Sequence, residues 1–108
     1  MTVQRSEIFD NDLEGQFRWY LAETALDPSD ALAVATRFAE AVDGALEVIW
    51  RNPEIVPGRF GGDPELAGTR SWRVRKPFDQ FLIFYRIKSG TVFAERLLEG
   101  HSRPVRGR

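Results

Sequence analysis

The chain has 108 residues, a length typical of one domain, which we expect to span residues 1–108. Hydrophobic residues make up 43% and charged residues 29%, which indicates a folded globular protein rather than a disordered segment or a membrane protein. The absence of cysteine excludes disulfide scaffolds, thiol nucleophiles and cysteine-bound zinc. We therefore expect no metal and no cofactor. No apolar run could span a membrane and no signal peptide is visible, so we expect a cytoplasmic protein.

The net charge of −1 hides two halves of opposite charge. Residues 1–54 carry 4 basic and 11 acidic groups, a net charge of −7, whereas residues 55–108 carry 11 basic and 5 acidic groups, a net charge of +6. A basic half is typical of a surface that binds nucleic acid or an acidic protein segment. Attraction between the two halves within one small fold is the alternative explanation.

The first half predicts a short strand and two helices. Residues 2–8 nearly alternate in polarity, as in a short strand, and residues 11–24 have apolar positions at steps of three and four, as in an amphipathic helix capped by Asp10 or Asn11. A longer helix over 29–51 follows, with Pro28 at its start. Its predicted buried positions are Leu32, Ala35, Phe38, Ala39, Val42, Ala45, Leu46, Val48 and Ile49.

The second half changes to a period of two. After a stretch rich in proline and glycine at 53–68, we predict strands over 71–76, 81–88 and 91–98, the last two joined by a tight Ser89-Gly90 turn. Connections this short predict antiparallel neighbours. The expected fold is α+β, a two-helix hairpin packed on a small antiparallel sheet of three to four strands, with a basic irregular tail from about residue 99.

Alternation assigns most strand residues to one of two faces. Tyr85 belongs to the core face, together with Phe81, Ile83 and Ile87, while Leu82, Phe84 and Arg86 belong to the open face. The last strand fits either register. We place Arg96 on an arginine-bearing open face with Arg73, Arg75 and Arg86, because an unpaired arginine in the core would be costly. The tryptophans Trp19, Trp50 and Trp72 are expected to pack in the core or between helix and sheet.

Several strings in this order resemble the ParE branch of the ParE/RelE toxin superfamily. They are Asn52-Pro53 with Pro57-Gly58, the segment 69–74 (TRSWRV), the strand 81–86 (FLIFYR) and the ending 96–103 (RLLEGHSR). The resemblance spans about residues 10–103. One departure is Glu99, which stands where the family often has histidine.

The resemblance implies the toxin of a type II toxin–antitoxin system, of the kind associated with plasmid stabilisation. Such a toxin inhibits DNA gyrase and blocks replication unless a ParD-like antitoxin binds it, usually two toxins with two antitoxins. Operator DNA would be contacted only through the antitoxin. No membrane partner is implied.

The RelE branch of the same superfamily provides an alternative, a ribosome-dependent mRNA endoribonuclease. Metal-free RNA cleavage needs a general base, a general acid and cations for the phosphate. Arginines could supply the cations, but no tyrosine follows Tyr85, and His101 is the remaining proton-transfer candidate. We therefore favour a binding protein without catalytic residues.

Two sets of binding residues follow from this interpretation. The candidate residues for the toxicity target are the charged groups of the last strand and tail, namely Arg96, His101, Arg103 and Arg106. The candidate residues for the antitoxin lie on the open face of the sheet, where cations and apolar groups could hold an acidic amphipathic segment: Arg73, Arg75, Leu82, Phe84 and Arg86.

Overall fold

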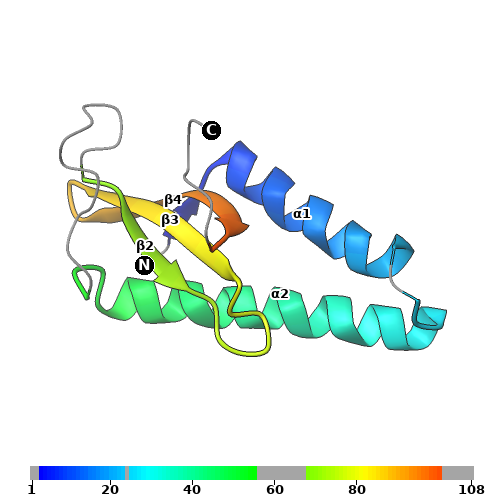
Figure 1. The fold of residues 1–108 in the computed structure, drawn as a ribbon. Helices are drawn as coiled ribbons and strands as arrows, with labels where there is room; N and C mark the ends of the chain where they lie inside the picture. The colour runs from blue at the N-terminus through cyan, green and yellow to red at the C-terminus, as the bar shows by residue number, and fades with distance from the viewer. Residues whose placement is uncertain (1–2, 24, 56–67, 101–108) are drawn as a thin grey trace.

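The computed structural model describes residues 3–23, 25–55 and 68–100. In chain order the elements are β1 (Val3–Arg5), α1 (Glu7–Ala22), α2 (Pro28–Arg51), β2 (Arg70–Arg73), β3 (Phe81–Lys88) and β4 (Thr91–Glu99). Figure 1 shows α2 running along one side of the sheet, while α1 forms a hairpin with α2 and lies beside β4. The α+β architecture of a helix hairpin on a small sheet is confirmed.

The sheet has four strands in the order β1-β4-β3-β2 and is mixed rather than purely antiparallel. The pairs β2–β3 and β3–β4 are antiparallel, as predicted, but β1 pairs parallel with β4 through Val3 opposite Val92. Both helices and two strands separate β1 from β4 in the sequence. The length of a short connection therefore could not predict that these two strands pair. β1 is also shorter than predicted, because residues 7 and 8 belong to α1.

Helix α1 begins four residues earlier than predicted because Ser6, not Asp10 or Asn11, is its N-cap. The Ser6 hydroxyl accepts a hydrogen bond from the Phe9 amide at 2.9 Å, and its own amide donates to the Ala94 carbonyl at 2.9 Å. One residue thus ends the pairing of β1 with β4 and starts the helix. The second helix runs from Pro28 to Arg51, close to the predicted 29–51, with Asp27 as its N-cap and Asn52 as its C-cap.

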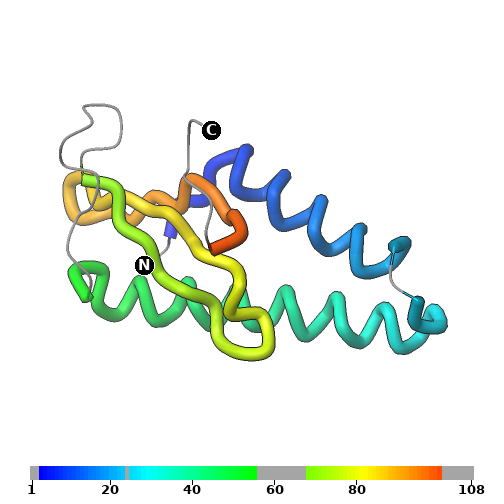
Figure 2. The backbone as a smooth tube through the Cα atoms, in the orientation of Figure 1, coloured from blue at the N-terminus to red at the C-terminus, as the bar shows by residue number. Residues whose placement is uncertain are grey.

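The core lies between α2 and the sheet. Phe38 is its centre, since its ring lies 5.2–5.5 Å from the rings of Tyr20, Phe78 and Phe81. The connection between β2 and β3 carries Phe78 and reaches α2, as the tube in Figure 2 shows. Most of the predicted stripe of α2 is buried, but Leu32 and Val48 are exposed, and Ala31 and Ala41 are buried in addition. Tyr85 is fully buried, as predicted.

Strand β4 contains a bulge that explains its ambiguous sequence pattern. Phe84 pairs with Arg96 but Tyr85 pairs with Ala94, so Glu95 is an extra residue on β4. Its carbonyl accepts a hydrogen bond from the Ser6 hydroxyl at 3.0 Å. Because of this insertion, Ala94 and Leu97 are both buried although three positions separate them. A strict period of two therefore could not place this strand.

Strand β2 is shorter than the predicted 71–76. It ends at Arg73, and turns follow before β3, with hydrogen bonds from the Phe78 amide to the Arg75 carbonyl and from the Phe81 amide to the Phe78 carbonyl. The β3–β4 turn is as predicted: Ser89 and Gly90 both have positive φ, 52° and 78°. Within the part of the chain described, no helix is long and apolar enough to cross a membrane.

Candidate functional site

The arginines expected to form one open-face cluster are dispersed over the fold. Arg73 lies opposite Leu82, four residues or about 13 Å along β3 from Arg86. Its guanidinium donates to the Asp79 carbonyl at 2.6 Å. Arg86 pairs with Glu95 of the bulge at 3.2 Å and is about a quarter exposed. These two cations therefore do not converge on a common ligand.

Arg75 lies in a different place, against α2. Its guanidinium is so close to Gly44 that a β-carbon there would come within 2.5 Å of it. The glycine in the middle of α2 thus makes room for an arginine side chain.

The two apolar residues expected on the open face differ in exposure. Leu82 is half-buried, whereas Phe84 is only 2% exposed and lies outside the main core cluster. The prediction that Phe84 is an exposed group of an open face is therefore wrong. An alternating pattern assigns a residue to a face but does not show what covers that face.

Arg96 forms an ion pair within the fold. Its Nε and Nη2 donate to the two carboxylate oxygens of Asp12 on α1, at 2.9 and 3.1 Å, and this bidentate pair raises the pKa of Arg96. Arg96 thus points to α1 rather than to an arginine face. The other three residues expected to bind the target, His101, Arg103 and Arg106, lie outside the described residues.

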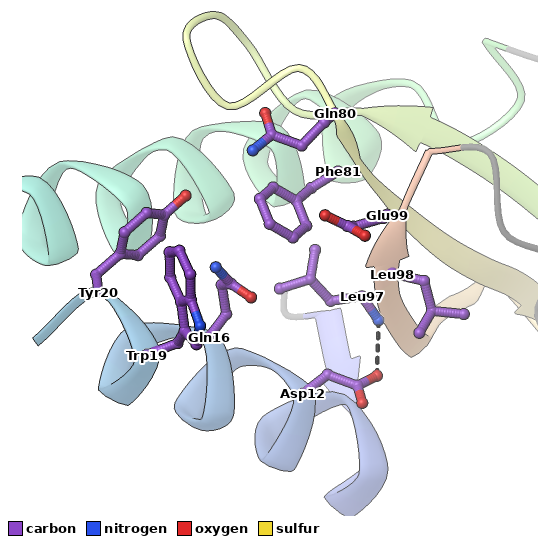
Figure 3. Close-up of a pocket in the computed structure, with 9 residues that line it drawn as sticks. All are labelled: Asp12, Gln16, Trp19, Tyr20, Gln80, Phe81, Leu97, Leu98 and Glu99. Carbon is purple, nitrogen blue, oxygen red and sulfur yellow. Dashed lines mark hydrogen bonds between the residues drawn. The ribbon is translucent and has the colours of Figure 1, made fainter. Parts of the chain in front are cut away.

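A hollow lies between α1, the start of β3 and the end of β4. It encloses about 580 Å³. Figure 3 shows the side chains that surround it: those of Asp12, Gln16, Trp19 and Tyr20 from α1, those of Gln80 and Phe81 at the start of β3, and those of Leu97, Leu98 and Glu99 from β4. We call this set of nine residues the α1–β4 hollow.

The α1–β4 hollow has an apolar floor and a mixed rim. The floor is formed by three buried side chains, those of Tyr20, Phe81 and Leu97. Trp19, which is 48% exposed, forms a side wall of the hollow. The Trp19 ring meets that of Tyr20 edge to face at 5.5 Å. A half-exposed tryptophan beside buried aromatic rings is typical of protein-binding surfaces.

The two carboxylates of the hollow differ in their electrostatic state. Asp12 is 16% exposed, is neutralised by Arg96 and also accepts a hydrogen bond from the Leu97 amide at 2.9 Å. Glu99 is exposed and has no ion-pair partner within residues 3–23, 25–55 and 68–100. Burial raises the pKa of Tyr20, a hydrogen bond with Gln16 lowers it, and the charge of Glu99 raises it again.

The sequence did not identify this site. All three tryptophans were expected to be packed, but Trp19 is 48% and Trp50 is 38% exposed. Trp72 is partly buried and packs against the core. The sequence contained one indication of the site: Glu99 stands where the family that the chain resembles often has histidine. Among the described residues, no group of acidic side chains is arranged to hold a metal ion.

Comparison with solved structures confirms the fold that the resemblance implied. The chain is similar to a chain of the chromosomal ParDE TA system from P. aeruginosa, with 19% sequence identity and a TM-score of 0.58. The similarity covers 92% of this chain and 95% of that chain, so it extends over both helices and the sheet. No family model matches the sequence, and no curated protein has a significant match to it.

Proposed function

We propose that this protein is a ParE-like toxin of a type II toxin–antitoxin system, held inactive by a ParD-like antitoxin. The observation that carries the proposal is the similarity of fold over nearly the full length of both chains to a member of a ParDE system. The family strings FLIFYR and RLLEG support it, because they form β3 and the end of β4. A complex of two toxins with two antitoxins is the proposed inactive form.

The proposed target of the free toxin is DNA gyrase rather than the ribosome. Cleavage of RNA would need several cations around one phosphate, whereas Arg73, Arg86 and Arg96 are each engaged with a different partner within the fold. This dispersion favours a protein that acts by binding. The proposed target contacts are His101, Arg103 and Arg106, with Arg96 supporting the strand that leads to them.

The sheet residues Arg73, Leu82 and Arg86 are proposed antitoxin contacts, because each keeps some exposed surface. Arg75 is exposed on the α2 side and would meet a different part of the antitoxin. Phe84 would contribute through packing, since its ring presents almost no surface. Truncation of Leu82 should therefore weaken antitoxin binding without loss of stability, whereas truncation of Phe84 should reduce both.

A pulse-labelling experiment tests the proposal. The chain is induced without antitoxin in a bacterial host, and incorporation of labelled thymidine and labelled methionine is followed in parallel. We expect DNA synthesis to stop first while translation continues, and co-expression of a ParD-like antitoxin to restore growth. The matched variant carries Arg103→Ala and Arg106→Ala, which should reduce toxicity while leaving the described fold unchanged.

The alternatives give different results in the same experiment. A collapse of translation within minutes, before DNA synthesis changes, would support the RelE-like endoribonuclease and a role for His101. Unchanged growth and labelling at full expression of folded protein would contradict a toxin of either kind.

A further inference from the structure

The α1–β4 hollow has three properties that together specify what can occupy it. Its floor is apolar and buried, formed by Tyr20, Phe81 and Leu97. Its wall, Trp19, keeps about half of its surface exposed. Its rim carries the carboxylate of Glu99, which Figure 3 shows pointing toward the ring of Phe81. An occupant that covers the hollow must satisfy all three.

The charge of Glu99 is the selective element. The other carboxylate, that of Asp12, already accepts two hydrogen bonds from Arg96 and one from a backbone amide. Glu99 lacks such a partner among the described residues, and its field reaches the hydroxyl of Tyr20 on the floor. Covering an unpaired carboxylate with a neutral or acidic group would remove its hydration without compensation. A cation would compensate it.

Resting on the function proposed above, we infer that the antitoxin inserts into the α1–β4 hollow a segment in which a bulky apolar side chain lies beside an arginine or lysine. The apolar side chain covers Phe81 and Leu97 on the floor. The cation pairs with Glu99, and its aliphatic stem lies along Trp19, whose ring face also attracts positive charge.

This inference gives the antitoxin a charge pattern that the sequence of the toxin did not suggest. Arg73 and Arg86, the proposed sheet contacts, favour acidic groups of the antitoxin, whereas the hollow favours a basic one. A partner with acidic and basic groups in the reverse order would meet like charges at both places. Glu99 would thus contribute to discrimination between cognate and non-cognate antitoxins.

The first test uses three small probes that share a benzyl group, applied to the full chain. Benzylamine, benzyl alcohol and phenylacetate differ at neutral pH in charge, which is positive, zero and negative. Nuclear magnetic resonance should show benzylamine shifting the Trp19 indole N–H and the Leu98 amide, with an affinity about three- to fivefold above that of benzyl alcohol, the ratio expected of an exposed ion pair. Phenylacetate should bind more weakly than both.

Matched variants separate the carboxylate from the cavity. Glu99→Gln should remove the preference for benzylamine while leaving benzyl alcohol binding unchanged, and Glu40→Gln, at an exposed acid of α2, should keep the preference. Trp19→Ala should weaken all three probes. Equal affinity of benzylamine and benzyl alcohol for the unmodified chain would overturn the inference.

The second test uses an antitoxin that neutralises the chain in the pulse-labelling experiment. Glu99→Lys should weaken this complex about tenfold or more, as replacing attraction by repulsion does at an interface. Replacement of the contacting arginine or lysine of the antitoxin by glutamate should restore it. If the antitoxin protects cells and yet binds Glu99→Lys unchanged, the inference fails while the proposed function stands. If no antitoxin protects and the chain is harmless, the proposed function itself fails.

Discussion

Asp12 of α1 and Arg96 of β4, 84 positions apart in the sequence, form a two-pronged ion pair at 2.9 and 3.1 Å. A third bond joins the same carboxylate to the Leu97 amide at 2.9 Å. The pairing of β1 with β4 ends at Ala94. Beyond that residue the edge of β4 has no neighbouring strand among the described residues, and the Asp12 side chain accepts the hydrogen bond of its Leu97 amide. The pair therefore fixes α1 beside the sheet and forms one end of the α1–β4 hollow.

Asp12→Ala should lower the free energy of unfolding by about 2 kcal/mol, because it leaves the Arg96 guanidinium and the Leu97 amide half-buried without their acceptor. Asp12→Asn should cost less, since an amide oxygen can still accept from Leu97. Glu14→Ala is the control: its pair with Arg18 is well exposed and should contribute less than about 0.5 kcal/mol. Urea denaturation measures all three. Equal losses for Asp12→Ala and Glu14→Ala would show that the pair does not fix α1.

Two glycines should respond to alanine with opposite signs. Gly15 lies on α1 with nothing within 4 Å of the added β-carbon, so Gly15→Ala should raise stability by up to about 1 kcal/mol. At Gly100 the β-carbon would come within 2.9 Å of the Gln80 carbonyl oxygen, a backbone atom that cannot turn away. Gly100→Ala should therefore lower the melting temperature and displace the end of β4. A stabilising Gly100→Ala would contradict the described contact with Gln80.

Tyr85 should make the stability of the fold fall at alkaline pH. Its hydroxyl donates to the Pro53 carbonyl at 2.8 Å, and burial raises its pKa, an effect that Arg70 partly offsets. Because the folded pKa lies above the unfolded value of about 10, this contribution is fully present below pH 10 and is lost as the pH rises through the folded pKa.

Tyr85→Phe provides the test. At neutral pH the variant should be less stable by about 1 kcal/mol, the contribution of one hydrogen bond. Between pH 9 and 11 its stability should fall less steeply than that of the unmodified chain, as measured by urea denaturation at each pH. Parallel curves would mean that the Tyr85 phenol does not couple ionisation to unfolding.

Phe38→Ala should be the most damaging single truncation among these predictions, at about 3–5 kcal/mol. Phe38 is fully buried, and three aromatic rings lie within 5.5 Å of its own. Trp50→Ala is the matched control on the same helix, because the tryptophan is 38% exposed and should cost about 1 kcal/mol or less. Similar melting temperatures for the two variants would contradict the assigned core.

Local patterns in the sequence were sufficient to predict most of the helices, strands and turns. The period of α2, the alternation of β3, the Ser89-Gly90 turn and the burial of Tyr85 were all predicted, because each depends on residues close together in the chain. The predicted cap of α1, Asp10 or Asn11, lies four or five residues after the observed one. Ser6 is a good N-cap by type, but its position was hidden by the apparent alternation of residues 2–8.

The candidate site was beyond the reach of such patterns. One inserted residue, Glu95, shifts the second half of β4, and a strand with a bulge fits neither alternating register. The partner of Arg96 lies 84 positions away. The α1–β4 hollow is lined by four residues of α1 together with residues 80, 81 and 97–99. Spacing along one segment was enough to predict the two helices, the Ser89-Gly90 turn and the core face of β3. The burial of Phe84 and the ion pair of Arg96 depend on which distant segment packs beside each residue, and so does the lack of an ion-pair partner for Glu99 among the described residues. Spacing along the chain carries no information on these contacts.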